Sequence, residues 1–75
     1  MSPRLPMLKA RDLVRALKLL GFFIIRQSGS HIFFKHPDGR ATIVPQRGGQ
    51  DIGRGLLRAI LNQIEMSPDE FMNYL

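Results

Sequence analysis

The sequence predicts an α+β fold made of a helix, a three-stranded antiparallel sheet, a second helix and a short last helix. Apolar residues recur at helical spacing near both ends of the 75-residue chain. Between them, three short runs rich in aromatic and β-branched residues are separated by turns that contain glycine. Strands joined by such tight turns pair in antiparallel fashion. Because each long helix has one apolar face, we expect both helices on one face of the sheet, with the other face open.

The first helix is predicted to begin at about Lys9 and to end before Gly21, since glycine is favoured just after a helix. Its apolar face consists of residues spaced three or four apart, namely Ala10, Leu13, Val14, Leu17 and Leu20. Its opposite face carries the basic residues Arg11, Arg15 and Lys18. Residues 1–7 contain two prolines and no periodic pattern, so we expect a flexible tail followed by a single domain over residues 8–75.

Three strands are predicted over residues 22–28, 31–35 and 40–44. The first two are joined by Ser28-Gly29-Ser30, where glycine allows a positive φ. The second and third are joined by Pro37-Asp38-Gly39, a sequence typical of tight turns. The three strands should therefore follow one another in the sheet as a meander.

A polar loop over residues 46–51 is expected to lead into the second long helix. Arg54 and Arg58 lie one turn apart on this helix, away from its apolar face. That face is predicted to consist of Ile52, Leu56, Leu57, Ile60, Leu61 and Ile64.

The last segment of the chain has the pattern of a capping box. Ser67 is a suitable N-cap, Pro68 occupies the first helical position, and Glu70 comes three residues after the serine. A short helix is therefore predicted here. Phe71 and Leu75 are expected to pack it against the rest of the domain.

Composition narrows the possible classes of function. Eleven Lys and Arg against six Asp and Glu give a net charge of +5, which favours a polyanionic partner such as nucleic acid or an acidic protein. The chain has no cysteine, which excludes thiol catalysis, a disulfide framework and the usual zinc knuckles. It also shows no signal-peptide pattern and no apolar run of membrane-spanning length. We expect a cytoplasmic protein with no membrane partner.

His31 is the candidate for acid–base catalysis on a phosphodiester. It follows Gly29-Ser30 at the predicted start of a strand, with Arg26 and Lys35 on either side in the sequence. An imidazole can both accept and donate a proton near neutral pH, and flanking cations would hold a phosphate group. The residues alone leave a catalytic role and a structural role open, because a lone histidine in a strand can also be a half-exposed packing residue.

His36 is not expected to act together with His31. Five strand residues separate positions by roughly 16 Å and place them on opposite faces. His36 should instead end its strand at the following turn. Metal binding by His31, His36 and Asp38 is not predicted, since their spacing fits no common ligand pattern. The backbone N–H groups at the start of the second long helix, with Arg54 and Arg58, are a further candidate for holding an RNA phosphate.

A set of spaced motifs resembles the HicA toxins, also called YcfA-like proteins, over about residues 9–75. The motifs are Leu17-x-x-x-Gly21-Phe22, Arg26-Gln27-x-Gly29-Ser30-His31, Phe34-x-His36-Pro37, Val44-Pro45 and Gly55-x-Leu57-Arg58-x-Ile60-Leu61. The resemblance implies a fold like a double-stranded-RNA-binding domain, cleavage of messenger RNA by the histidine after Gly-Ser, and inhibition by a HicB antitoxin. That histidine is His31. Many members have a second histidine directly after it, where this chain has Ile32.

We therefore predict the toxin component of a type II toxin–antitoxin system. It would be a metal-independent endoribonuclease without a cofactor, with His31 as its single catalytic residue and a HicB-like antitoxin as its protein partner. The residues predicted to bind RNA are all basic: Arg11, Arg15, Lys18, Arg26, Lys35, Arg47, Arg54 and Arg58. The alternative is a non-catalytic RNA-binding or antitoxin-binding module of the same fold.

Overall fold

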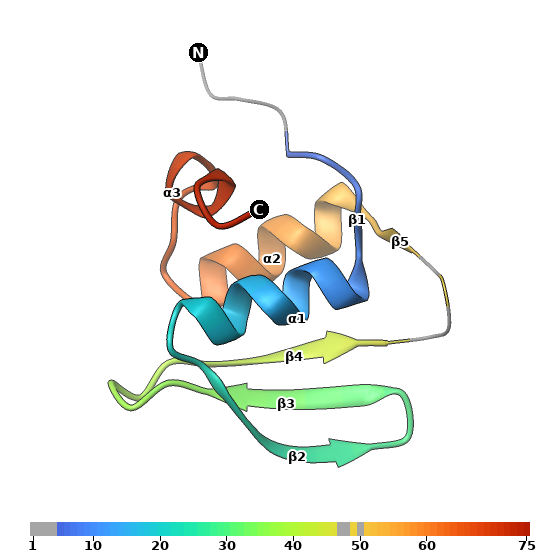
Figure 1. Cartoon of the computed structure of the whole chain (residues 1–75), viewed down its shortest axis with the longest axis vertical. Coiled ribbons are helices and arrows are strands. Elements are labelled where there is room, and N and C mark those ends of the chain that lie inside the picture. Colours follow the sequence, from blue (N-terminus) through green and yellow to red (C-terminus); the bar gives the residue numbers. More distant parts are fainter. Residues whose placement is uncertain (1–4, 47–48, 50) are drawn as a thin grey trace.

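A computed structural model of the chain describes residues 5–46, 49 and 51–75. The helices are α1 (Ala10–Leu19), α2 (Arg54–Gln63) and α3 (Pro68–Met72). The strands are β1 (Leu8–Lys9), β2 (Phe23–Ser28), β3 (His31–Lys35), β4 (Ala41–Pro45) and β5 (Asp51–Ile52). Figure 1 shows α1 and α2 lying side by side next to the main sheet, with α3 at the far end. The predicted helix–sheet–helix order and the short last helix are confirmed.

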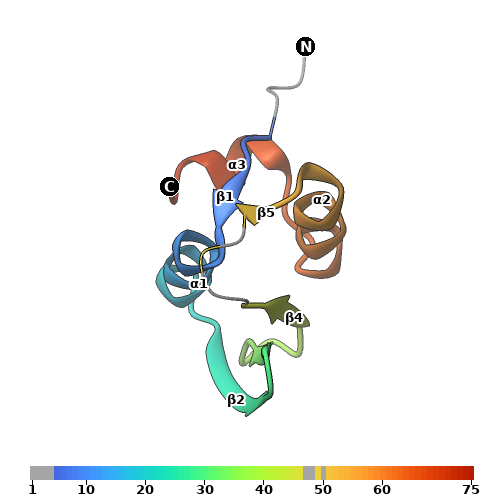
Figure 2. The same ribbon diagram turned by 90° about the vertical axis from the view of Figure 1, so that its right-hand side faces the viewer.

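The main sheet has the strand order β2-β3-β4, and both pairs are antiparallel, as predicted. Ile32 and Phe34 of β3 and Val44 of β4 are buried toward the helices, whereas the residues between them face the other way. Figure 2 shows the sheet on one side of the helix layer. The largest fully buried side chains come from the helices and the sheet alike: Leu13, Leu17, Phe34, Val44, Leu57, Ile60, Leu61, Ile64 and Phe71.

Strand β2 forms one edge of the sheet, and all six of its residues are exposed. The helices pack against β4 instead, so they leave β2 uncovered. The pairing register between β2 and β3 shifts between Ile24 and Arg26, which leaves Ile25 in a bulge. As a result, Phe23, Ile24 and Ile25 present apolar side chains to solvent.

Helix α1 ends in the hydrogen-bond pattern of a Schellman motif. The N–H of Gly21 donates to the carbonyl oxygen of Lys18 at 3.1 Å, and the N–H of Phe22 donates to that of Leu17 at 2.9 Å. Gly21 has a φ of +99°, a value that glycine adopts without steric cost. The expected helix end at Gly21 is therefore confirmed, and it directs the chain into β2.

A second, two-stranded sheet was not expected from the sequence. Leu8 pairs with Ile52 and Lys9 with Asp51, across the positions where a helix start and a loop were predicted. The Lys9 Nζ also lies 2.8 Å from the Asp51 carboxylate. Strands of two residues leave no periodic pattern, and this pairing joins segments more than forty residues apart. Leu5 is only 2 % exposed in the core, so at this residue the expected flexible tail is replaced by packed structure.

Two apolar residues that were predicted to pack lie outside the observed core. Leu56 is 42 % exposed and Leu75 is 45 % exposed, although helical spacing had placed both at packed positions. The capping box itself is confirmed, because the Ser67 hydroxyl accepts a hydrogen bond from the Glu70 N–H at 3.2 Å. Phe71 is fully buried and is the residue that attaches α3 to the domain.

Candidate functional site

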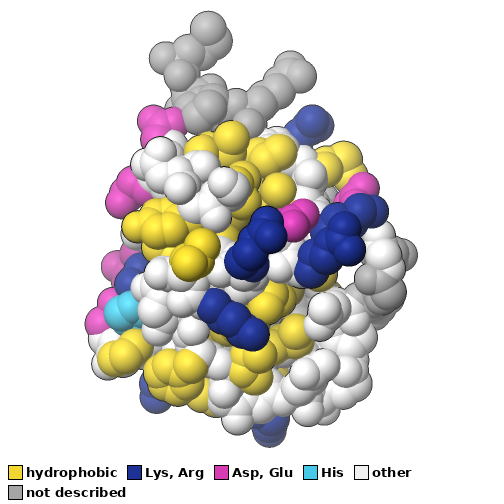
Figure 3. Space-filling view, viewed as in Figure 1, with side chains coloured by type: hydrophobic (Ala, Val, Ile, Leu, Met, Phe, Trp, Pro, Cys, Tyr) yellow, Lys and Arg dark blue, Asp and Glu magenta, His cyan; other side chains and the backbone are white. Residues whose placement is uncertain are grey.

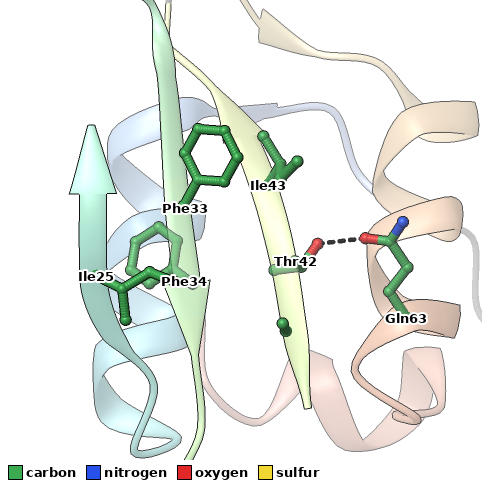
Figure 4. Close-up of a pocket in the computed structure, with 7 residues that line it drawn as sticks. Ile25, Phe33, Phe34, Thr42, Ile43 and Gln63 are labelled. Carbon is green, nitrogen blue, oxygen red and sulfur yellow. Dashed lines mark hydrogen bonds between the residues drawn. The ribbon is translucent and has the colours of Figure 1, made fainter. Parts of the chain in front are cut away.

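The face of the sheet turned away from the helices carries the candidate site. Along β3, His31, Phe33 and Lys35 point to this open face, alternating with the buried residues Ile32 and Phe34. Figure 4 looks onto the open face, with α1 behind the strands.

His31 is the first residue of β3 and is exposed. Its cross-strand partners are Ser28 in β2 and Pro45 in β4, so it lies where the β2–β3 turn ends. Gly29 in that turn has a φ of +57°, as the turn prediction requires. Within residues 5–46, 49 and 51–75, the His31 imidazole has no hydrogen-bond or ion-pair partner. Its ring is therefore accessible to a molecule from solvent.

Among the residues that the structure describes, Arg26 is the cation nearest to His31 on the open face. It pairs with Phe33 across the strands, which makes it a diagonal neighbour of His31 at roughly 7–8 Å between backbones. Its guanidinium lies over the Phe33 ring, with Cζ 4.4 Å from the ring centroid. Lys35 shares this face but is four strand residues from His31, a separation of about 13 Å. Arg26 can therefore hold an anion beside His31, whereas Lys35 serves a more distant one.

A hollow of about 390 Å³ lies next to this row of residues. Its walls include the apolar side chains of Ile25, Phe33 and Ile43 (Figure 4). At its margin, the Thr42 hydroxyl donates a hydrogen bond to the Gln63 side-chain oxygen at 2.6 Å, which ties β4 to α2. The open face thus combines basic groups with a recessed apolar surface.

His36 lies just beyond the opposite end of β3, in the turn that leads to β4. Its ring packs edge-on against Phe22 with 5.0 Å between centroids, and its Nδ1 accepts a hydrogen bond from the Asp38 N–H at 3.1 Å. Arg40 completes the turn by binding the Asp38 carboxylate through its Nε at 2.8 Å. The backbone N–H of Arg40 also donates to this carboxylate and holds the pKa of Asp38 below its usual value of 3.8. His36 ends its strand at the turn, as predicted.

The basic residues of the helices are not on the open face. Arg11, Arg15 and Lys18 are exposed on α1, and Figure 3 shows Lys and Arg side chains gathering over this helix. Arg15 is paired with Asp12 at 3.3 Å. The predicted RNA-binding residues are thus divided between two faces.

On α2, Arg54 and Arg58 are exposed, and the Nε of Arg54 donates to the Leu5 carbonyl oxygen at 2.8 Å. Arg54 therefore ties the N-terminal segment to the start of α2 in addition to any role in binding. The remaining residue predicted to bind RNA, Arg47, lies outside the described residues.

In the described part of the chain, no group of three or more His, Asp or Glu side chains is arranged to hold a metal ion. The same residues contain no helix with the length and apolar character needed to cross a membrane.

Residues 10–66 match the family model described as the HicA toxin of bacterial toxin–antitoxin. The chain belongs to the HicA toxin family. It is therefore a toxin of a toxin–antitoxin system, and an antitoxin is the partner that this membership implies. A search of curated proteins gave no match. The matched span of the HicA chain contains α1, the main sheet and α2, and with them His31 and Arg26.

Sequence reasoning missed one residue that shapes the HicA site and one residue that holds the turn at the far end of β3. Phe33 supports Arg26 on the open face, and Arg40 joins the β3–β4 turn to the end of α2 through a 2.6 Å hydrogen bond to the Ile64 carbonyl oxygen. The signal for Phe33 was available, because it lies two strand positions after His31 and therefore on the same face. The sequence held no comparable signal for Arg40, since its partner is 24 residues away.

Proposed function

We propose that this HicA toxin is an endoribonuclease that cleaves messenger RNA with His31 as its single catalytic residue, without a metal or cofactor. One observation carries the proposal. Of the two histidines, only His31 presents an accessible ring on a face that also holds a nearby cation, Arg26. His36 instead packs against Phe22 and contributes its ring to a turn.

The arrangement suits cleavage by the ribose 2′-hydroxyl. The 2′-oxygen bonds to phosphorus while the bond from phosphorus to the 5′-oxygen breaks, which gives a 2′,3′-cyclic phosphate and a 5′-hydroxyl end. The imidazole of His31 accepts the 2′-hydroxyl proton, and water at this exposed site gives a proton to the leaving 5′-oxygen. The hydroxide that remains takes the proton from the imidazolium, which restores neutral His31 and water. Arg26 stabilises the negative charge that develops on the phosphate oxygens.

The basic residues on the helices would act away from the cut. Arg11, Arg15 and Lys18 lie on α1, and Arg54 and Arg58 lie on α2. We propose that they contact the backbone of a longer RNA that extends past the sheet, because exposed cations displace counterions from nucleic acid. The proposed substrate places the protein in the cytoplasm.

We propose a HicB-type antitoxin as the inhibitor, bound over His31. Phe23, Ile24 and Ile25 of β2 are exposed close to the open face, and a group of exposed apolar side chains is typical of a surface that binds a protein. Acidic groups of the antitoxin would then face Arg26 and Lys35. One interface would block the catalytic residue and the phosphate-binding charge together.

The proposal is tested by growth arrest on induced expression. The parent and His36→Ala should arrest growth, and co-expressed antitoxin should relieve the arrest. His31→Ala should permit growth while still being purified as a folded protein that binds the antitoxin. A folded His31→Ala variant that arrests growth like the parent would contradict catalysis by His31 and favour the non-catalytic binding module.

A further inference from the structure

We propose that the open face of β3 and β4 binds single-stranded RNA, with a nucleobase stacked on Phe33 beside the phosphate that lies at His31. The proposal rests on the proposed function for the cut at His31. It adds the form of RNA that is bound and the residue that positions it. The face does not require base pairing, and its geometry favours unpaired bases.

The charge of the sheet points to a polyanion. Strands β2, β3 and β4 contain His31, Arg26 and Lys35 and no acidic residue. All three of these residues belong to the open face, in a row that starts at His31. Charge complementarity therefore selects a negatively charged chain as the occupant rather than a neutral peptide.

Phe33 gives this charged face a stacking surface. It stands two positions after His31, about 7 Å along the strand, so a base on a nucleotide bound at His31 is within its reach. Bases of single-stranded RNA stack on aromatic rings and on arginine guanidinium planes. Here the two are combined, because the Arg26 guanidinium already lies over the Phe33 ring with Cζ 4.4 Å from its centroid.

The hollow beside Phe33 extends the surface on the side of β4. Ile43 is 45 % exposed there, and Figure 4 shows its side chain next to the Phe33 ring on the same face. An exposed apolar recess of about 390 Å³ matches the flat face of an unpaired base better than it matches phosphate. A duplex cannot use it, since its bases are stacked on one another and present only their edges and backbone.

Lys35 marks the direction of the bound strand. It lies on the same face two positions beyond Phe33, again about 7 Å further along β3. A phosphate at His31 and Arg26, a base at Phe33 and a second phosphate at Lys35 therefore follow one another along one strand. Phosphate, base and next phosphate follow one another in this order along a single RNA strand.

The test measures binding of a short fluorescent oligoribonucleotide to the full chain carrying His31→Ala, which leaves the RNA uncut. Adding Phe33→Leu should weaken the affinity for the single strand about ten-fold. Phe33→Tyr should retain the affinity, because the ring is kept. Tyr74→Leu, which removes another exposed aromatic ring outside the sheet, should leave it unchanged. A blunt duplex of the same sequence should bind equally well with and without Phe33.

Arg26→Gln provides a second variant that does not depend on how Phe33→Leu folds. It should lower the affinity and reduce the slope of log affinity against log salt by about one. A folded Phe33→Leu variant with undiminished single-strand affinity would overturn the proposal. The proposal would also be overturned if Phe33→Leu lost antitoxin binding and kept its RNA affinity, because the open face would then bind a protein and not RNA. The proposed function fails separately, if purified parent protein does not cleave RNA although Phe33→Leu still weakens binding.

Discussion

The two ends of strand β3 differ in what their histidines contact. At the open end, His31 is exposed, faces away from the helices and has a cation diagonally across the sheet. At the tied end, His36 packs on Phe22 and accepts a hydrogen bond within its turn. Arg40 then connects the same turn to the C-terminal end of α2. Strand β3 thus begins with a histidine that a substrate can reach and is followed by a histidine whose ring is held by contacts within the protein.

This difference shows that a histidine's role is set by its surroundings and not by its strand. A catalytic imidazole must reach a substrate, so it cannot be surrounded by its own protein. A structural imidazole contributes through contacts that a substrate would have to displace. The comparison therefore predicts that changes at the tied end lower stability and leave catalysis alone.

The largest effect on stability is expected from Gly21→Ala. Gly21 has a φ of +99°, and a Cβ there would lie 3.0 Å from the His36 Nε2. We expect the free energy of unfolding to fall by about 1–3 kcal/mol. Chemical denaturation measures it. Gly29→Ala is the matched control, since its φ of +57° is also positive but its Cβ would meet nothing within 4 Å. An equal loss in both variants would show that His36 does not restrict Gly21.

Arg40→Ala should have the next largest effect. The variant removes hydrogen bonds to the Asp38 carboxylate and to the Ile64 carbonyl oxygen, and the stacking of the guanidinium over Phe22. We expect a loss of roughly 1–2 kcal/mol in the free energy of unfolding, with the RNA cleavage rate unchanged. Arg40→Lys should not restore the stability, because an ammonium cannot make the same set of directed contacts. Full stability in Arg40→Lys would argue that only the charge matters.

The smallest effect is a pH dependence at the same turn. The Arg40 N–H holds the pKa of Asp38 below 3.8, so the unfolded chain binds this proton more readily than the folded chain does. The stabilisation is therefore present above the unfolded pKa and is lost as the pH falls through the lower, folded value. Melting temperatures of the parent and Asp38→Asn should converge in acid and separate slightly above about pH 4. If the two melting temperatures differed by the same amount at every pH, ionisation of the Asp38 carboxylate would not contribute to the stability of the fold.

The sequence predicted the parts of the fold that depend on local pattern. Helical spacing placed Leu13 and Leu17 in the core, and the turns at Gly29 and Gly39 both have positive φ. The β1–β5 pair and the burial of Leu5 depend on contacts between distant segments, which no local period records. Leu56 was misplaced for a related reason, because helical spacing does not say how wide a face the neighbouring layer covers.

The candidate site was predictable in its catalytic residue but not in its surface. Gly29-Ser30-His31 identifies a turn followed by a histidine, and strand alternation puts Phe33 and Lys35 on the same face as His31. The position of Arg26 over Phe33 follows from the two-residue β2–β3 turn, which pairs Ser28 with His31 and so Arg26 with Phe33. The bulge at Ile25 lies beyond Arg26 and instead changes which face Phe23 and Ile24 present, and the sequence gives no sign of it.

The most direct test measures RNA cleavage rate and free energy of unfolding for His31→Ala and His36→Ala side by side. His31→Ala should slow cleavage by about 10²–10⁴-fold and change the free energy of unfolding by less than about 0.5 kcal/mol. His36→Ala should lower the free energy of unfolding by about 1–2 kcal/mol and keep the parental cleavage rate. A stable His31→Ala variant that cuts RNA at the parental rate would contradict the account.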